Sequence, residues 1–349
     1  MNRTLSSKQI LLPILMICVG VATDLGAQGI RKYPKGVDAK IEASIKRGIG
    51  YLVRTQDRSG AWRASGYGSY PTAMTALAGM ALIGSGSTPT RGKYWRSVRK
   101  ATNFLVKQAQ PDGVITVAAE EGRSMYGHGF STMFLAQVYG MEEDPRLQKK
   151  LHKVLTNAVN VIARAQSGHG GWYYTPESRS DEGSVTVTQL QALRACRNAG
   201  IVVPKKTIDN AVGYIRKSAN SDGSIRYSLR GGGAGRPAIT AAAVAVLYNA
   251  GKYDDPVAAK ALKYAIRTLP VNGSGQGHHY YAQLYLSQAL YQTGDKRWDK
   301  YYAKMSSWLI RSQRKDGSWQ GDGVGQTYGT AIALTILQLP YALVPIYQR

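Results

Sequence analysis

One short motif occurs twice in this chain, and the repeat constrains its fold more than any other feature. RTQDRSGAW at 54–62 returns as RSQRKDGSW at 311–319. A link glycine recurs with it, at Gly60, Gly113, Gly170, Gly223, Gly273 and Gly317. The spacing of roughly 50 residues is too long for one helix and suits two helices joined by a link. The sequence therefore predicts about six helical hairpins.

The two helices of each predicted hairpin differ in polarity. Residues 41–52 place isoleucine or leucine at i, i+4, i+8 and i+11 with basic residues between them, which is typical of an amphipathic surface helix. TAMTALAGMALI at 72–83 and TAIALTIL at 330–337 carry no charge. Such runs of about 12 residues are too short to span a bilayer, so we expect them to be buried. The alternation predicts an all-α fold, an α/α toroid in which apolar helices form an inner ring and amphipathic helices an outer ring.

The link motif also carries a family resemblance. It pairs a glutamine with a tryptophan in three hairpins, as Gln56 with Trp62, Gln166 with Trp172, and Gln313 with Trp319. This pattern, over about residues 38–340, resembles the QW repeat of squalene–hopene cyclases and protein prenyltransferase β-subunits. The resemblance implies a terpenoid cyclase/prenyltransferase-like toroid, similar to exported bacterial squalene-cyclase-like proteins. It also implies that the glutamine bonds backbone groups at helix ends, so we expect a structural clasp.

The best-known active-site motifs of those families are missing from this sequence. Squalene–hopene-type cyclases protonate an alkene with an acid in Asp-x-Asp-Asp, and no two aspartates of this chain are two positions apart. Prenyltransferase β-subunits hold zinc partly through Asp-x-Cys, whereas Arg194 stands at that distance before Cys196. We therefore expect no metal and no cofactor, and the sequence leaves open whether the protein is an enzyme.

Aromatic and polar residues gather where each link meets the following apolar helix. In a toroid these helix starts surround one end of the central cavity, so their side chains are candidate rim-binding residues. The candidates are Tyr67, Tyr70, Tyr126, His128, Asp181, Glu182, Arg230, Arg236, His278, His279, Tyr280, Tyr281 and Tyr328. Histidine exchanges protons near neutral pH, and arginine clamps anions. Structural alternatives remain: His128 as a partner of a backbone carbonyl, and Glu182 as a charge at a helix N-terminus.

The chain is strongly basic and begins with a segment that resembles a secretory signal. Lys and Arg total 45 against 21 Asp and Glu, which favours an acidic partner or an anionic envelope surface. No nucleic-acid recognition motif is present. Residues 1–27 combine Arg3 and Lys8 with an apolar run at 10–22, so we expect a periplasmic or extracellular protein, with an uncleaved anchor as the alternative. Residues 28–349 are then expected to form a single toroid domain.

Three functions are compatible with these features. The resemblance implies a toroid that binds, and in the enzymatic case transforms, an isoprenoid or lipid-like ligand in a central cavity. The charge and the Tyr/His/Arg rim favour instead a protein that binds an acidic polysaccharide or cleaves it as a lyase. The third is a non-catalytic envelope scaffold whose cavity is filled by side chains. The sequence leaves these three functions and the oligomeric state open.

Overall fold

The computed structural model describes residues 33–66, 68–273 and 277–348. The predicted signal segment and Tyr67 lie outside these residues. Pro34–Arg349 group into one compact unit. In the described part of this unit, β-structure is limited to isolated bridges between helices, such as Ala109 with Ile115. The expected all-α class is confirmed.

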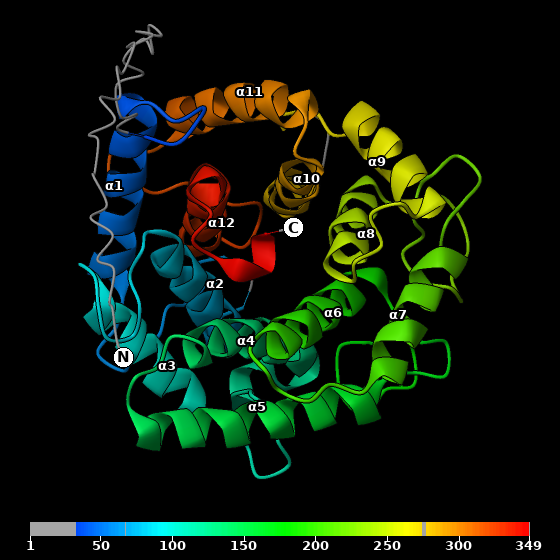
Figure 1. Ribbon diagram of the computed structural model, residues 1–349, viewed down its shortest axis with the longest axis horizontal. Helices are drawn as coiled ribbons and strands as arrows, with labels where there is room; N and C mark the ends of the chain where they lie inside the picture. Colours follow the sequence, from blue (N-terminus) through cyan, green and yellow to red (C-terminus); the bar gives the residue numbers. More distant parts are fainter. Residues whose placement is uncertain (1–32, 67, 274–276, 349) are drawn as a thin grey trace, which may run out of the picture. The chain divides into compact units, whose positions relative to one another are not determined.

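Twelve α-helices of the described chain form two concentric layers (Figure 1). The outer helices are α1 (Ala39–Thr55), α3 (Trp95–Lys107), α5 (Pro145–Ala165), α7 (Lys205–Lys217), α9 (Pro256–Thr268) and α11 (Lys296–Ser312). The inner helices are α2 (Pro71–Gly84), α4 (Ser124–Tyr139), α6 (Gly183–Asn198), α8 (Pro237–Asn249), α10 (His279–Thr293) and α12 (Gln326–Gln338). Each inner helix packs against the next, and α12 packs against α2. The inner ring is therefore closed, as an α/α toroid of six hairpins requires.

The polarity pattern explains which helices lie inside. Every residue of α2 is buried, whereas α1 buries only one stripe that includes Ile41, Ile45 and Leu52. Small residues let the layers approach closely. A Cβ added to Gly48 of α1 would lie 2.7 Å from the Trp319 ring, so a side chain there would push the two layers apart. None of the described helices is both long enough and apolar enough to cross a membrane.

The glutamine–tryptophan motif ties each of its three hairpins to the next outer helix. Gln56 Nε2 donates to Gly60 O within its own link and to Ser97 O at the start of α3, both at 2.9 Å. Trp62 Nε1 donates to Leu52 O in the last turn of α1, at 2.8 Å. One glutamine and one tryptophan therefore use backbone carbonyls at the end of one outer helix, in its link and at the start of the next.

The other two copies of the motif repeat this geometry. Gln166 donates to Thr207 O of α7, and Gln313 donates to Ser44 O of α1, each at 2.9 Å. Trp172 and Trp319 donate to the preceding outer helix as Trp62 does, each at 2.7 Å. Because Gln313 belongs to the last hairpin and Ser44 to the first, the same clasp closes the ring.

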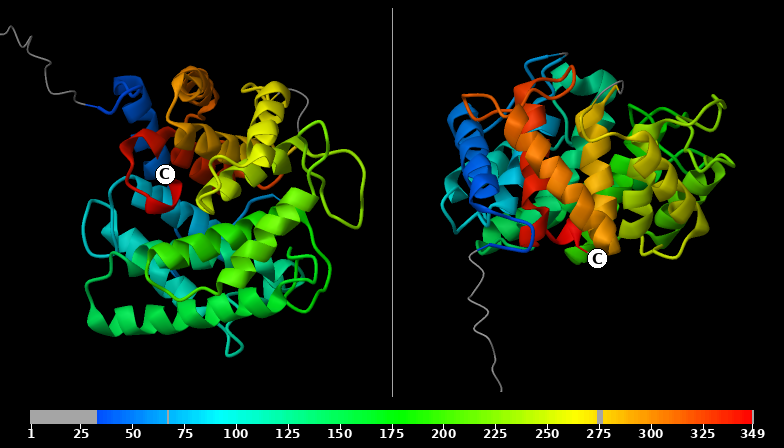
Figure 2. Two further views of the ribbon diagram at one scale, coloured as in Figure 1. Left: turned by 45° about the vertical axis from the view of Figure 1, so that its right-hand side comes forward. Right: turned by 90° about the horizontal axis from the view of Figure 1, so that it is seen from above.

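The chain after α12 turns under the inner ring as two short 3₁₀ helices, η2 (Leu339–Tyr341) and η3 (Pro345–Tyr347). Asn249 Nδ2, at the end of α8, donates to Ile346 O at 3.1 Å. Gln292 Nε2, near the end of α10, donates to Tyr347 O at 3.3 Å. Ile346 and Tyr347 are buried, and the C-terminus lies on the side away from the links (Figure 2, right). The C-terminal segment therefore covers one end of the ring, and the links surround the other.

Candidate functional site

Tyrosines from the inner helices form the floor at the link end of the ring. Tyr126 of α4, Tyr281 of α10 and Tyr328 of α12 are partly exposed, whereas Tyr285, one turn deeper than Tyr281, is fully buried. The rings of Tyr281 and Tyr285 lie 4.8 Å apart. Burial raises the pKa of Tyr281, and the nearby Tyr126, Glu182 and Tyr328 raise it further. We call Tyr126, Tyr281, Tyr328 and Glu182 the tyrosine mouth.

Glu182 is the carboxylate of the tyrosine mouth. It precedes α6 and accepts hydrogen bonds from Ser184 N at 2.9 Å and Val185 N at 2.5 Å. The Tyr126 hydroxyl donates to Glu182 Oε1 at 3.3 Å and also hydrogen-bonds the Ser184 hydroxyl. Burial raises the pKa of Glu182, and the bonds from Ser184 and Val185 oppose that shift. This carboxyl is therefore a better proton acceptor than an exposed one, and a phenol is bonded to it.

An aromatic wall leads from the mouth to the surface. Tyr126 stacks on Tyr174 with ring centroids 5.8 Å apart, and Tyr174 stacks on Tyr173 at 4.4 Å. The Tyr174 hydroxyl bonds the Tyr227 hydroxyl, and the Arg123 guanidinium lies 5.1 Å from the Tyr174 ring. The sequence analysis missed this wall. Its signal was GWYYTP at 171–176, in which two tyrosines directly follow the clasp tryptophan.

The structure places His128 in the core, away from the mouth. His128 is fully buried; its Nδ1 accepts from Ile115 N at 3.0 Å, and its Nε2 donates to Ala158 O at 3.2 Å. In four other hairpins the matching backbone N–H donates to a threonine hydroxyl, of Thr75, Thr186, Thr240 or Thr330. Burial lowers the pKa of His128 to about 4, so the ring is neutral at physiological pH. The expectation of a rim-binding role is corrected: His128 replaces the threonine of the repeat.

Two of the candidates at the start of α10 point away from the mouth. The His279 ring lies 4.9 Å from the Trp308 ring of α11, and the Tyr280 ring lies 5.9 Å from it. His279 and Tyr280 therefore pack between the two layers, and burial lowers the pKa of His279. His278 is exposed with a left-handed φ of 59°. Only Tyr281 of this run reaches the tyrosine mouth, so the rim expectation for His279 and Tyr280 is corrected.

The remaining candidates lie on the links around the mouth. Arg230 and Arg236 are exposed on the link before α8. Tyr70 precedes α2 with a left-handed φ of 43° and is partly buried. Asp181 is buried, and its Oδ1 accepts from Leu229 N at 3.1 Å, which ties two links together. None of these four has a printed contact with the tyrosine mouth, so they form its surroundings.

Two carboxylates that the sequence analysis missed cap inner helices from neighbouring links. Glu120 accepts from the backbone N–H of Thr72 in α2 at 2.8 Å and also bonds the Thr72 hydroxyl. Asp322 accepts from Tyr280 N of α10 at 3.2 Å. Burial raises the pKa of Glu120. Together with Glu182, these groups place a carboxylate at the N-termini of α2, α6 and α10, where the helix dipole favours negative charge. Within the described residues, no three His, Cys, Asp or Glu side chains converge as a metal site would require.

Comparison with known proteins supports the fold. No protein-family model and no curated relative matches the chain. The type II terpene cyclase MstE from Scytonema is 16% identical with a TM-score of 0.60, covering 88% of this chain and 98% of that one. The α-1,6-mannanase GH76A of Salegentibacter sp. HEL1_6 is 9% identical with a TM-score of 0.64, covering 88% and 100%. A protein from Actinoplanes is 18% identical with a TM-score of 0.59, covering 87% and 99%.

These likenesses establish the α/α toroid and its superfamily-level resemblance to terpene cyclases. They do not choose a chemistry, because the same scaffold carries a cyclase and a mannanase. MstE has been crystallised with geranylgeranyl dihydroxybenzoate, and an inactive variant of the mannanase with α-1,6-mannotetrose. The side chains of the mouth must therefore decide between an isoprenoid and a glycan.

Proposed function

We propose that the protein binds an acidic polysaccharide at the tyrosine mouth and acts on it as a lyase. The observation that carries the proposal is the hydroxyl-rich, partly exposed floor formed by Tyr126, Tyr281 and Tyr328. A tyrosine offers a ring face to the C–H face of a sugar and a hydroxyl to its oxygens. The basic charge of the chain favours a polymer that carries carboxylates. Export through a signal at residues 1–27 would bring the protein to such polymers.

The Tyr126–Glu182 pair suits the proton removal that a lyase requires. In β-elimination the C–H bond next to the uronate carboxylate breaks, and the neighbouring C–O bond breaks as a double bond forms. Tyr126 is exposed enough to take the proton, whereas Glu182 is fully buried behind it. Burial and the charge of Glu182 raise the pKa of Tyr126, so a free phenolate is disfavoured. The phenol must therefore pass its own proton to Glu182 Oε1 as it accepts the substrate proton.

Other mouth residues supply the remaining functions of this reaction. The leaving oxygen needs a proton, and the hydroxyls of Tyr281 and Tyr328 are candidate donors because burial keeps both phenols protonated. Arg123, over the aromatic wall, is the cation placed to pair with the uronate carboxylate. Glu182 acts through Tyr126 and is therefore a positioning residue.

Cleavage of a uronate polymer tests the proposal directly. The purified protein is incubated with polygalacturonate and with alginate, unsaturated ends are followed by ultraviolet absorbance, and oligomer binding is followed by calorimetry. We expect Tyr126→Phe to abolish cleavage and to leave oligomer affinity within about threefold. Tyr139→Phe is the matched control, because it makes the same change at the far end of α4. No binding and no unsaturated ends with either polymer would reject the proposal, and equal losses in the two variants would place the site elsewhere.

An isoprenoid is the second candidate ligand. The shared fold of MstE and the apolar inner helices favour it. It requires an apolar space on the axis of the ring, where the structure has Tyr281 stacked on the buried Tyr285. Native mass spectrometry of protein purified gently from its own cells separates the candidates. An adduct of lipid mass that Tyr281→Trp displaces would favour the isoprenoid, and saturable binding of uronate oligomers alone would favour the glycan.

A further inference from the structure

The excess positive charge of the chain is concentrated on the outer layer. Each outer helix carries three to five Lys or Arg and at most one Asp or Glu. By contrast, α2, α4, α8, α10 and α12 contain no Lys, Arg, Asp or Glu. Like charges on one surface repel each other and destabilise the compact state. A ring that carries them on all six outer helices is suited to a polyanion.

One place on this layer combines uncompensated charge with a hollow. Helices α3 and α5 are the only neighbouring outer helices of the described chain that both lack an acidic residue. Between them lies an open hollow of about 500 Å³, which we call the α3–α5 groove. It is lined by Arg99, Asn103, Asp144, Arg146, Leu147 and Lys150. Ligand sites commonly measure about 300–1,000 Å³, and the openness of this one suits a chain that continues beyond it.

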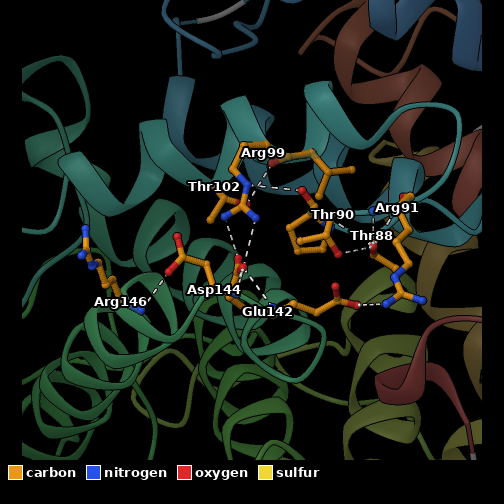
Figure 3. Close-up of polar contacts among 11 residues, drawn as sticks. Thr88, Thr90, Arg91, Arg99, Thr102, Glu142, Asp144 and Arg146 are labelled. Atoms are coloured by element: carbon orange, nitrogen blue, oxygen red, sulfur yellow. Dashed lines mark hydrogen bonds and ion pairs between the residues drawn. The ribbon is translucent and has the colours of Figure 1, made fainter.

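The carboxylates at the groove are already engaged by neighbouring groups (Figure 3). Glu142 forms a two-pronged pair with Arg99 at 2.7 and 3.0 Å, and Arg99 Nε donates to Pro89 O at 3.2 Å. The Glu142 side chain is completely buried in this pair. Asp144 lies on the groove itself, and its Oδ1 caps α5 by accepting from Arg146 N at 2.9 Å. The groove therefore has a rigid base fixed by Arg99.

The cationic heads of Arg146 and Lys150 remain available for a ligand. Both residues are exposed, one turn apart on α5, and no ion pair in the described part of the chain involves either of them. Asn103, on α3, adds an exposed amide, and Leu147 gives a half-buried apolar floor. A guanidinium binds a carboxylate or sulfate through two parallel hydrogen bonds, and an ammonium adds a point charge.

We propose that the α3–α5 groove is a second binding site for an acidic polysaccharide, separate from the tyrosine mouth. The choice of polymer rests on the proposed function, whereas the anion site rests on the groove alone. A polymer suits the outer layer because its basic helices form the perimeter of the ring, and a flat bilayer can touch only one side of it (Figure 1). The lining contains no aromatic residue on which a nucleic-acid base would stack. The groove thus holds a long chain while the mouth acts on another part of it.

Charge reversal at the groove provides the test. The purified protein is titrated with long polygalacturonate and with trigalacturonate at several salt concentrations. R146E/K150E is compared with K260E/K263E, which changes the net charge equally on α9, a helix that lines no part of the groove. We expect the groove variant to lose at least tenfold in affinity for the long polymer and the α9 variant less than threefold. The salt dependence should also become shallower in the groove variant, by roughly one to two contacts, because bound cations release counterions.

The outcomes separate this proposal from the lyase. Equal losses in the two variants would overturn the groove as a site and leave only a general effect of charge. Binding of phosphatidylglycerol vesicles or single-stranded DNA that depends on Arg146 and Lys150, without binding of polygalacturonate, would also overturn it. Loss of long-polymer affinity with unchanged trigalacturonate affinity would support it. Groove-dependent polymer binding without any trigalacturonate binding or cleavage would refute the function of the mouth alone.

Discussion

Replacing Gln313 by alanine tests whether the ring is held closed by its last clasp. Gln313 Nε2 donates to Ser44 O and to Gly317 O, both at 2.9 Å. Its Oε1 accepts from the Ser44 hydroxyl at 2.8 Å and also bonds Arg47. A net hydrogen bond contributes about 0.5–1.5 kcal/mol, and Ser44 O keeps its place in the α1 helix when the glutamine is lost. We therefore expect Gln313→Ala to lower the free energy of unfolding by about 2–4 kcal/mol.

Urea unfolding followed by circular dichroism measures this loss. Gln110→Ala is the matched control, because Gln110 is exposed and its Nε2 bonds only Gln108 O and Thr116 O, close by in the chain. We expect the control to lose less than about 1 kcal/mol, since water replaces those bonds. Gln166→Ala, at an internal clasp, should lose about 2 kcal/mol. If Gln313→Ala is no more harmful than Gln110→Ala, the reasoning that the clasp holds the ring is refuted.

Three further substitutions have expected outcomes. His128 has a pKa near 4 when folded against about 6.5 when unfolded, so its share of the stability is present above pH 6.5 and is lost as the pH falls towards 4. His128→Gln should remove up to about 3 kcal/mol of that acid sensitivity, measured as the difference in urea midpoints between pH 7 and pH 4.5. Tyr347→Ala should cost about 3 kcal/mol in urea unfolding, since it empties a buried aromatic site under the ring, whereas Tyr347→Phe should cost less than about 1. Gly170→Ala should lower the melting temperature by several degrees, because φ is +95° and the new Cβ would lie 2.3 Å from Asn210 O. Gly213→Ala in helix α7, where a Cβ meets nothing within 4 Å, should leave the melting temperature unchanged or raise it.

The toroid could be predicted from the sequence because period and polarity together determine it. A spacing of roughly 50 residues specifies hairpins, and uncharged helices must lie inside. The exact register of the weaker repeats could not be read in this way. Gln110 stands where Asp57 stands in the first hairpin, since their N–H groups bond Val114 O and Ala61 O in the same way. The motif therefore lacks its glutamine in the second hairpin, although a glutamine is close by.

The mouth was harder to predict because neighbouring residues on a helix point in different directions. His279, Tyr280 and Tyr281 follow one another, and each step turns the side chain by about 100°. Only the packing against α11 shows that the first two face Trp308. For His128 a signal was available. It follows Ile115 by 13 residues, the spacing at which Thr75 follows Trp62, so aligning the hairpins indicates a structural partner.

The polar groups on the axis explain why a ligand must enter from the links. At the far end Gln191 donates to Asn249 Oδ1 at 3.1 Å and to Gln288 Oε1 at 2.8 Å, in a buried amide network. Asn249 and Gln292 complete it by donating to carbonyls of η3. Without that segment their N–H groups would lose these acceptors in a buried site, which is costly. The closed end is therefore part of the fold, and variation among the links is free to shape the open end. Links one, three and six keep the clasp, whereas links two and four lack its tryptophan and supply Arg123 and Tyr227 to the aromatic wall.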